Sequence, residues 1–423
     1  MNFIIIFFLF FIFSINSKAC ETQKIGFNTK NITDIANILM DVEKKNINTQ
    51  FESYKCSNAF SKKKEPVSLK TANKMVALIQ ENNSQLKQQC DKAKPHDCFK
   101  HGTSISTEMP PVKTKYSIVL MHGLYESPVN LKHTQEMYAS MGFNVINLRL
   151  PGHGTKDNKV IKKIKWQDWD KKMKQALKLA EELGDKVIVH GHSTGGLLAH
   201  KAMLDYSNSP KNNTKIHGLI TSSPSLKISD SSKIKAYGGT FLNTLGLNKL
   251  TESISKHPPE PGIEVNKLSH YLQKKYSPTA YNYVADPYAD LEDTENISDD
   301  ELEDASIKEI YGKVKNIPIL QIGSDHDSVV VPEYNNKVMK FLKTKTNALN
   351  ISPNKCFDEI LKNYNIYAAT MYHDISSDFL KFKKSLLVNT LIKAKKNKCA
   401  ISLQKEQLQV LEFIDKNFPG RCD

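Results

Sequence analysis

The chain has 423 residues, of which 39% are hydrophobic and 25% charged, and its formal net charge is +14. This composition excludes an intrinsically disordered chain, and the length allows one large α/β domain with additions or two ordinary domains. The 59 lysines and arginines are scattered, without the spacing typical of nucleic-acid-binding proteins, so no nucleic-acid partner is expected. A basic surface is compatible with contact with an anionic membrane surface, and nothing in the sequence indicates the oligomeric state.

The first nineteen residues have the pattern of an export signal. Residues 3–13 are an unbroken apolar run, too short to cross a bilayer as a helix but suited to the h-region of a signal peptide. Small residues at Ser17 and Ala19 suit a cleavage site, although no Lys or Arg precedes the apolar run. We expect residues 1–19 to be removed and the protein to be secreted or periplasmic, with a retained membrane anchor as the alternative.

Seven cysteines fit an exported chain, because disulfides persist in oxidising compartments. Since the number is odd, at least one cysteine stays outside any set of internal bridges. Cys20 is the first residue of the expected mature chain and could carry a lipid anchor in a bacterium, which would leave six cysteines for three bridges of unknown pairing. None has metal-site spacing, so no metal is expected. The seven are Cys20, Cys56, Cys90, Cys98, Cys356, Cys399 and Cys422.

Residues 20–110 are predicted to form a helical N-terminal extension and linker. Helical periodicity covers residues 31–45 and 69–90, and His, Gly, Ser and Pro residues interrupt the stretch 95–111. We therefore place the start of the main folded core at residue 111.

From residue 116 onward, short apolar runs alternate with amphipathic helical stretches. Apolar strands separated by helices favour a parallel sheet covered on both faces, that is, an α/β core over residues 111–224 and 316–423. Helices are expected at residues 166–183 and 195–206 and again between 378 and 417. The predicted strands are 116–121, 143–148, 187–189, 216–221, 317–322 and 366–371.

Residues 225–315 interrupt the strand–helix alternation. The segment has helical patterns of its own and an acidic run at 286–309, which we interpret as a solvated face. An insertion of this length usually forms a lid or cap over a site, so we predict a cap here.

The pentapeptide Gly191-His192-Ser193-Thr194-Gly195 matches the GxSxG nucleophile elbow. It follows a predicted strand and precedes a predicted helix, the context that this motif requires. The flanking glycines let the two backbones pass closely, and the tight turn exposes the hydroxyl. We therefore predict that Ser193 is a nucleophile and that Thr194 supplies one backbone N–H to an oxyanion hole.

His122-Gly123-Leu124 directly follows the first strand of the core. An oxyanion hole needs a second backbone N–H, and we assign it to Leu124. His122 is expected to hydrogen-bond a neighbouring loop and to have no direct part in the chemistry.

Together these motifs resemble the monoacylglycerol lipase, lysophospholipase and bacterial carboxylesterase group of α/β-hydrolases. The resemblance covers residues 116–225 well and 317–374 more loosely. It implies the α/β-hydrolase fold, a serine esterase or lipase without a cofactor, and a structural turn at His153. The segments that carry it are His122-Gly123, residues 148–154 (LRLPGHG), Trp166, Trp169 and residues 191–196 (GHSTGG).

A serine nucleophile needs a basic histidine and a carboxylate that orients it, and in this fold they follow the serine in the order acid, histidine. Asp327 resembles the acid of the family, in which one residue separates the aspartate from the valines that follow. Asp325 is the alternative acid, and His326 is expected to have no role in the site. His373 follows the last predicted strand and is assigned as the base. The interval between acid and base is long for the family, and we place the surplus at residues 345–363.

The sequence thus predicts a secreted serine hydrolase that cleaves a carboxylic ester, such as a monoacylglycerol or lysophospholipid, through an acyl-enzyme. Two alternatives stay open: an aminopeptidase or acyltransferase on the same fold, and a non-catalytic binding protein that keeps the fold. The acidic residues of the cap keep an amine-binding site possible for the first alternative.

Overall fold

The computed structural model describes residues 50, 52–56, 66–87, 101–107, 111–155, 158–233, 235–237, 258–279, 298–325, 327–351 and 397–422. The expected signal peptide, the predicted helix at 31–45, the predicted strand at 366–371 and His373 lie outside these residues.

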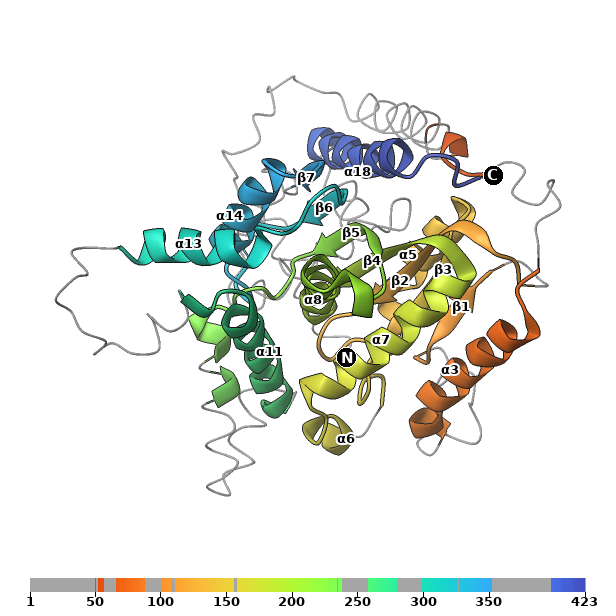
Figure 1. Cartoon of the computed structure of the whole chain (residues 1–423), viewed down its shortest axis with the longest axis horizontal. Helices are drawn as coiled ribbons and strands as arrows, with labels where there is room; N and C mark the ends of the chain where they lie inside the picture. Colours follow the sequence, from red (N-terminus) through yellow and green to blue (C-terminus); the bar gives the residue numbers. More distant parts are fainter. Residues whose placement is uncertain are drawn as a thin grey trace, which may run out of the picture.

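A seven-stranded sheet forms the centre of the molecule, in the order β1-β3-β2-β4-β5-β6-β7 (Figure 1). The strands from β2 to β7 pair in parallel, and β1 pairs antiparallel with β3 at the edge. The predicted parallel α/β sheet is therefore confirmed. The strands are β1 (Ser104–Ser106), β2 (Thr114–Met121), β3 (Asn144–Leu148), β4 (Gly184–His192), β5 (Ile216–Ser222), β6 (Ile319–Ile322) and β7 (Ala348–Ile351).

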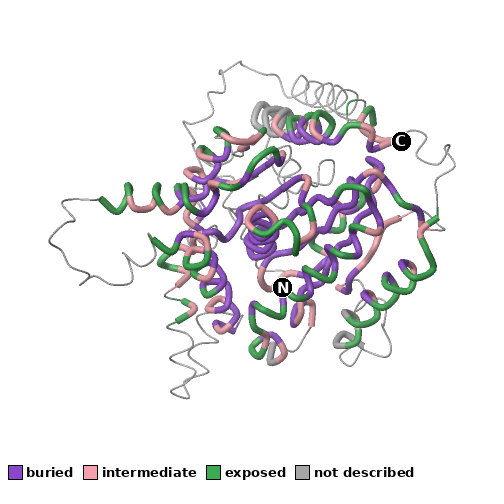
Figure 2. The backbone as a smooth tube through the Cα atoms, in the orientation of Figure 1, coloured by how far each residue is buried: buried purple, intermediate pink, exposed green. Residues whose placement is uncertain are grey.

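Helices cover both faces of the sheet, which is why its strands are apolar on both sides. In β2, Val119 joins the core on the face covered by α7, α8 and α14, and Leu120 joins the core beneath α5 and α18. Figure 2 shows the buried backbone concentrated in the strands and the inner sides of these helices. The described helices are α3 (Leu69–Lys87), α5 (Lys132–Ser140), α6 (Asn158–Lys162), α7 (Trp166–Leu183), α8 (Thr194–Asn208), α11 (Glu260–Tyr276), α13 (Asp299–Tyr311), α14 (Pro332–Lys343) and α18 (Asn397–Asn417), with short 3-10 turns at Pro128–Leu131 and Pro210–Asn212.

The predicted linker is wrong where the edge strand β1 forms, and a second edge strand, β7, was not predicted. Strand β1 lies within the stretch 95–111 that we expected to be a linker, and β7 lies within the stretch 345–363 that we took for surplus sequence. Both strands are short and only partly buried, so neither has the continuous apolar run that marks a central strand. Strand β7 pairs in parallel with β6, the strand that ends just before the candidate acids Asp325 and Asp327.

Within the described residues, a helix and a disulfide are among the contacts that join the N-terminal extension to the core. Helix α3 packs on α7, where Thr71 Oγ1 donates to Glu182 Oε2 at 2.9 Å. Farther upstream, Cys56 forms a disulfide with Cys422, and the N–H of Cys56 donates to Ser140 O at 3.0 Å. The expectation of disulfides is thus confirmed for this pair.

The described part of the segment predicted to form a cap, residues 225–315, is mainly helical. Helix α11 packs against α7 and α8, and α13 packs against α14. The residues of the first turn of α13 are exposed, which agrees with the interpretation of the acidic run as a solvated face. Within the described residues, none of the helices combines the length and the apolar character needed to cross a bilayer.

Candidate active site

Ser193 occupies a sharp turn between the end of β4 and the start of α8. Its backbone has φ 51° and ψ −115°, a conformation that non-glycine residues rarely adopt. A Cβ at Gly191 would lie 2.1 Å from the carbonyl oxygen of Gly195, and one at Gly195 would lie 2.1 Å from Met121 O. Both glycines of the motif are therefore required by close backbone contacts, which is the geometry of a nucleophile elbow.

The hydroxyl of Ser193 has a second serine beside it. Ser193 Oγ and Ser225 Oγ lie 3.1 Å apart and share a hydrogen bond, and the N–H of Ser225 donates to Ser193 O at 3.1 Å. Both side chains are almost fully buried. Ser225 was not predicted from the sequence; its position just past the end of β5, at the carboxyl edge of the sheet, was the available signal.

The turn after β2 lies directly against the elbow. A Cβ at Gly123 would come within 3.1 Å of Ser193 Cβ. The turn closes on itself, because the N–H of Glu126 donates to Gly123 O at 3.3 Å and the N–H of Gly123 donates to Glu126 Oε2 at 2.7 Å. The N–H of Gly123 is therefore occupied, and Leu124 stays the predicted oxyanion donor of this turn. Thr194, the other predicted donor, is the first residue of α8, where N–H groups have no acceptor within the helix.

His122 and His153 are structural, as expected. The buried His122 ring donates from Nδ1 to Gly123 O at 2.8 Å and accepts the N–H of Leu150 at Nε2, at 3.1 Å. The rings of His122 and His153 pack at a centroid distance of 4.9 Å. Burial lowers the pKa of His122 well below its ordinary range and that of His153 to about 4, so both rings are neutral near pH 7.

His192, the residue before Ser193, is also buried with its own partners. Its Nδ1 lies 3.1 Å from Ser222 O, and its Nε2 lies 3.9 Å from Glu126 Oε1. The ring thus hydrogen-bonds β5 on one side and lies near the Glu126 carboxylate on the other. These contacts assign His192 a supporting role.

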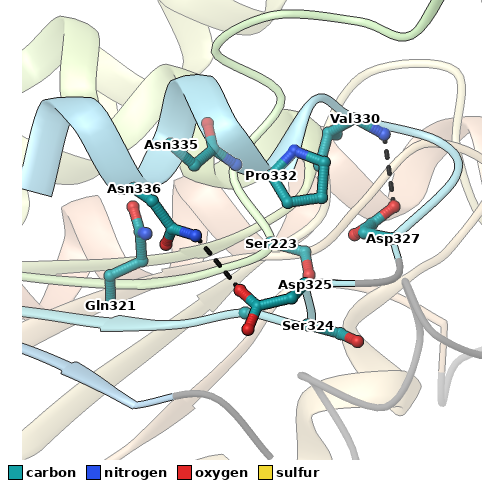
Figure 3. A pocket seen from close by; sticks show the side chains of 10 residues that line it. Ser223, Gln321, Ser324, Asp325, Asp327, Val330, Pro332, Asn335 and Asn336 are labelled. Atoms are coloured by element: carbon teal, nitrogen blue, oxygen red, sulfur yellow. Dashed lines mark hydrogen bonds between the residues drawn. The ribbon is translucent and has the colours of Figure 1, made fainter. Parts of the chain in front are cut away.

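Of the two candidate acids, Asp327 is buried and Asp325 is exposed. Asp327 is 7% exposed, and its Oδ1 accepts the N–H groups of Val329 at 2.9 Å and Val330 at 3.2 Å. Asp325 is exposed and accepts a hydrogen bond from Asn336 Nδ2 at 3.1 Å. Figure 3 shows both carboxylates at the rim of a small polar hollow, Asp327 on the side of Val330 and Asp325 turned towards Asn336.

The predicted base, His373, lies outside the described residues, as does His326. The described site therefore brings together the elbow, the Gly123–Glu126 turn and Ser225, with Asp327 after β6 at the same edge of the sheet. Sequence reasoning missed the contacts of Tyr125 and Glu126, which lie in a turn noted only for its His-Gly pair.

Comparison with known proteins places the core in a family. The family model described as "Serine aminopeptidase, S33" (Hydrolase_4) matches residues 112–359, more than half of the chain. The phospholipase YtpA of Bacillus subtilis (strain 168) is 30% identical over 137 residues, which are 32% of this chain and 49% of that protein. The chain thus spans about half the length of this curated relative.

Solved structures of lipolytic enzymes also align with the chain. One, reported for the metagenome-derived lipolytic enzymes LipS and LipT, has 16% identity and a TM-score of 0.40, covering 70% of this chain and 97% of that one. A soluble variant of monoglyceride lipase from Saccharomyces cerevisiae has 13% identity and a TM-score of 0.39, covering 72% of this chain and 91% of that one. With its parallel sheet, its nucleophile elbow and the family match over residues 112–359, the chain belongs to the Hydrolase_4 family of α/β-hydrolases.

Proposed function

We propose that this protein is a secreted serine hydrolase that cleaves carboxylic esters with an apolar acyl chain, such as a monoacylglycerol or a lysophospholipid. The observation that carries the proposal is the backbone of Ser193, held at φ 51° between β4 and α8 against the Gly123–Glu126 turn. Such strain at a serine is maintained by the surrounding structure and is typical of a nucleophile elbow. Similarity to a protein named as a phospholipase supports a lipid ester as substrate.

In the proposed reaction, Ser193 Oγ attacks the ester carbonyl while its proton passes to His373. The N–H groups of Leu124 and Thr194 stabilise the negative charge on the former carbonyl oxygen. The bond to the alcohol then breaks, and the alcohol leaves with the proton from His373. Water, deprotonated by His373, attacks the acyl-enzyme and releases the carboxylic acid, while Asp327 orients His373 and stabilises its protonated form.

The assignment of His373 is supported by elimination. It is the only histidine in the chain after Asp327, the order that the fold requires. The histidines next to the elbow, His122 and His192, already hydrogen-bond other groups. The two backbone N–H groups on Asp327 favour it over Asp325 as the acid, since they hold its carboxylate in one position.

Two carboxylates of the predicted cap are paired with lysines, which supports an ester over a peptide substrate. An aminopeptidase needs a carboxylate for the substrate's ammonium group, and the cap is where we expected one. Glu264 pairs with Lys267 at 2.9 Å, and Glu303 pairs with Lys227 and Lys337. In the part of the cap that the structure describes, these carboxylates are already neutralised by lysines. The family description keeps aminopeptidase activity as the second candidate.

We also propose export to an oxidising compartment. The Cys56–Cys422 disulfide supports it, because such bonds persist outside the reducing cytosol. The apolar run at residues 3–13 supports it independently. Lipidation at Cys20 and contact with anionic lipid are further parts of this proposal.

The experiment that tests the function is fluorophosphonate labelling of the purified protein beside Ser193→Ala. Turnover of p-nitrophenyl esters of increasing acyl length, of a lysophospholipid and of aminoacyl p-nitroanilides is measured on the same samples. Labelling that is lost in Ser193→Ala, with ester turnover, is the expected result. Anilide turnover that exceeds ester turnover would instead establish the aminopeptidase, and a folded protein without labelling or turnover would contradict both.

A further inference from the structure

We propose that Tyr125 is a positioning residue that connects the cap to the oxyanion turn, so that the position of the cap sets the position of the Leu124 N–H. This inference rests on the proposed function, since it concerns the same site. Tyr125 has a backbone conformation that is unfavourable for a tyrosine. Tyr125 is the third residue of the turn closed between Gly123 and Glu126, and its φ is 62°. Turns with positive φ at this position favour glycine or asparagine.

Contacts of Tyr125 with its surroundings must stabilise its strained backbone conformation. A left-handed conformation is unfavourable at a non-glycine residue, because Cβ comes close to the backbone carbonyl oxygen. Glycine would adopt this backbone conformation without strain. The contribution of a tyrosine here must therefore come from the contacts of its side chain. Burial raises the pKa of Tyr125 above its ordinary value, so its hydroxyl stays protonated at neutral pH and acts as a donor.

The side chain of Tyr125 reaches the cap. Its hydroxyl donates to Pro258 O at 2.6 Å, across 133 positions of sequence. Pro258 is buried and stands directly before Pro259, the N-cap residue of α11. Helix α11 of the cap therefore begins two residues after Pro258, the residue that holds the oxyanion turn.

The other end of the same turn is braced on the nucleophile elbow. A Cβ at Gly123 would lie 3.0 Å from His192 Cδ2 and 3.1 Å from Ser193 Cβ, so the turn packs directly on the elbow. Glu126 Oε2 closes the turn by accepting the N–H of Gly123 at 2.7 Å. The turn that presents Leu124 thus lies between the elbow, which it contacts at Gly123, and the cap, which it contacts through Tyr125. Because an oxyanion donor acts only when it is preorganised, loosening either brace reduces stabilisation of the tetrahedral intermediate.

The test compares Tyr125→Phe with Tyr116→Phe in the full-length protein. Tyr116 is a matched control, because its hydroxyl also donates to a proline carbonyl, Pro419 O at 3.1 Å. That bond joins β2 to the C-terminal segment and has no part in the site. The measurements are kcat and KM for p-nitrophenyl butyrate, the melting temperature, and the affinity for a trifluoromethyl ketone with a butyl chain. The hemiketal that this ketone forms with Ser193 carries an oxyanion.

We expect Tyr125→Phe to lower kcat by about 3- to 10-fold, the effect of one lost hydrogen bond, with little change in KM. The affinity for the trifluoromethyl ketone falls by the same factor, and Tyr116→Phe changes neither quantity. Tyr125→Gly is the second variant: it fits the positive φ and so retains the fold, but it has no hydroxyl and shows the same loss of kcat.

Wild-type kcat and ketone affinity in Tyr125→Phe would overturn the inference while leaving the hydrolase intact. Equal losses in Tyr125→Phe and Tyr116→Phe, each accompanied by a lower melting temperature, would also overturn it, since they indicate a general effect of stability. A wild-type protein that neither reacts with fluorophosphonate nor hydrolyses the butyrate would refute the proposed function itself, and the inference with it.

Discussion

Asp205 lies where the nucleophile helix α8 meets the cap helix α11, and its replacement by asparagine tests how the cap is attached. Its Oδ2 lies 2.5 Å from Lys201 Nζ on α8, and its Oδ1 lies 2.8 Å from Lys275 Nζ on α11. The Tyr276 hydroxyl donates to the same Oδ1. Lys201 is only 2% exposed and also pairs with Asp170 on α7 at 2.9 Å.

Breaking a buried ion pair by removing one partner costs about 3–5 kcal/mol. We expect Asp205→Asn to lower the free energy of unfolding by about 3 kcal/mol, the lower end of that range. Lys201 still pairs with Asp170 in the variant, and Lys275 can turn to solvent. The measurement is the free energy of unfolding from urea titration. The control is Asp185→Asn, whose exposed pair with Lys113 predicts a change of less than about 1 kcal/mol. A loss for Asp205→Asn below 1 kcal/mol, or equal to that of the control, would refute the reasoning.

The same network predicts a pH dependence. Although burial alone would raise it, the lysine partners lower the pKa of Asp205 to about 2 in the folded protein. In the unfolded chain an aspartate has a pKa near 3.9. A depressed folded pKa means that the stabilisation is complete above the unfolded pKa and is lost as the pH falls towards 2. The stability difference between wild type and Asp205→Asn should therefore shrink between pH 4 and pH 2.

Three further substitutions give distinct outcomes. Gly195→Ala places a Cβ 2.1 Å from Met121 O and should abolish fluorophosphonate labelling, whereas Gly323→Ala, with open space around its Cβ, should retain it. Cys56→Ser removes the disulfide and should lower the free energy of unfolding by about 2–5 kcal/mol, and Cys422→Ser and the double variant should show the same loss. Ser225→Ala removes the hydroxyl partner of the nucleophile and should change kcat by about 2- to 12-fold without affecting the melting temperature; unchanged kcat would show that the contact is incidental.

The sequence predicted those elements whose neighbours impose a regular pattern. Helix α7 begins and ends where its apolar periodicity does, at Trp166–Leu183, because one stripe of the helix packs on the sheet. The central strands were recognised because both of their faces are covered. The edge strands β1 and β7 were not, since a strand of three or four partly buried residues has no periodicity that distinguishes it from a loop.

In the site, too, features set by local sequence could be predicted and features set by long-range contacts could not. The elbow could be predicted because its requirements are local: glycine is needed two residues on each side of Ser193, where backbones pass at contact distance. Asp327 is likewise fixed by backbone N–H groups only two and three residues away. The contacts of Ser193 with Ser225 and of Tyr125 with Pro258 join segments 32 and 133 positions apart, so no local pattern contains them. It follows that the residues expected to carry the covalent chemistry can be predicted from motifs, whereas those that position them emerge only from the packing of the cap on the core.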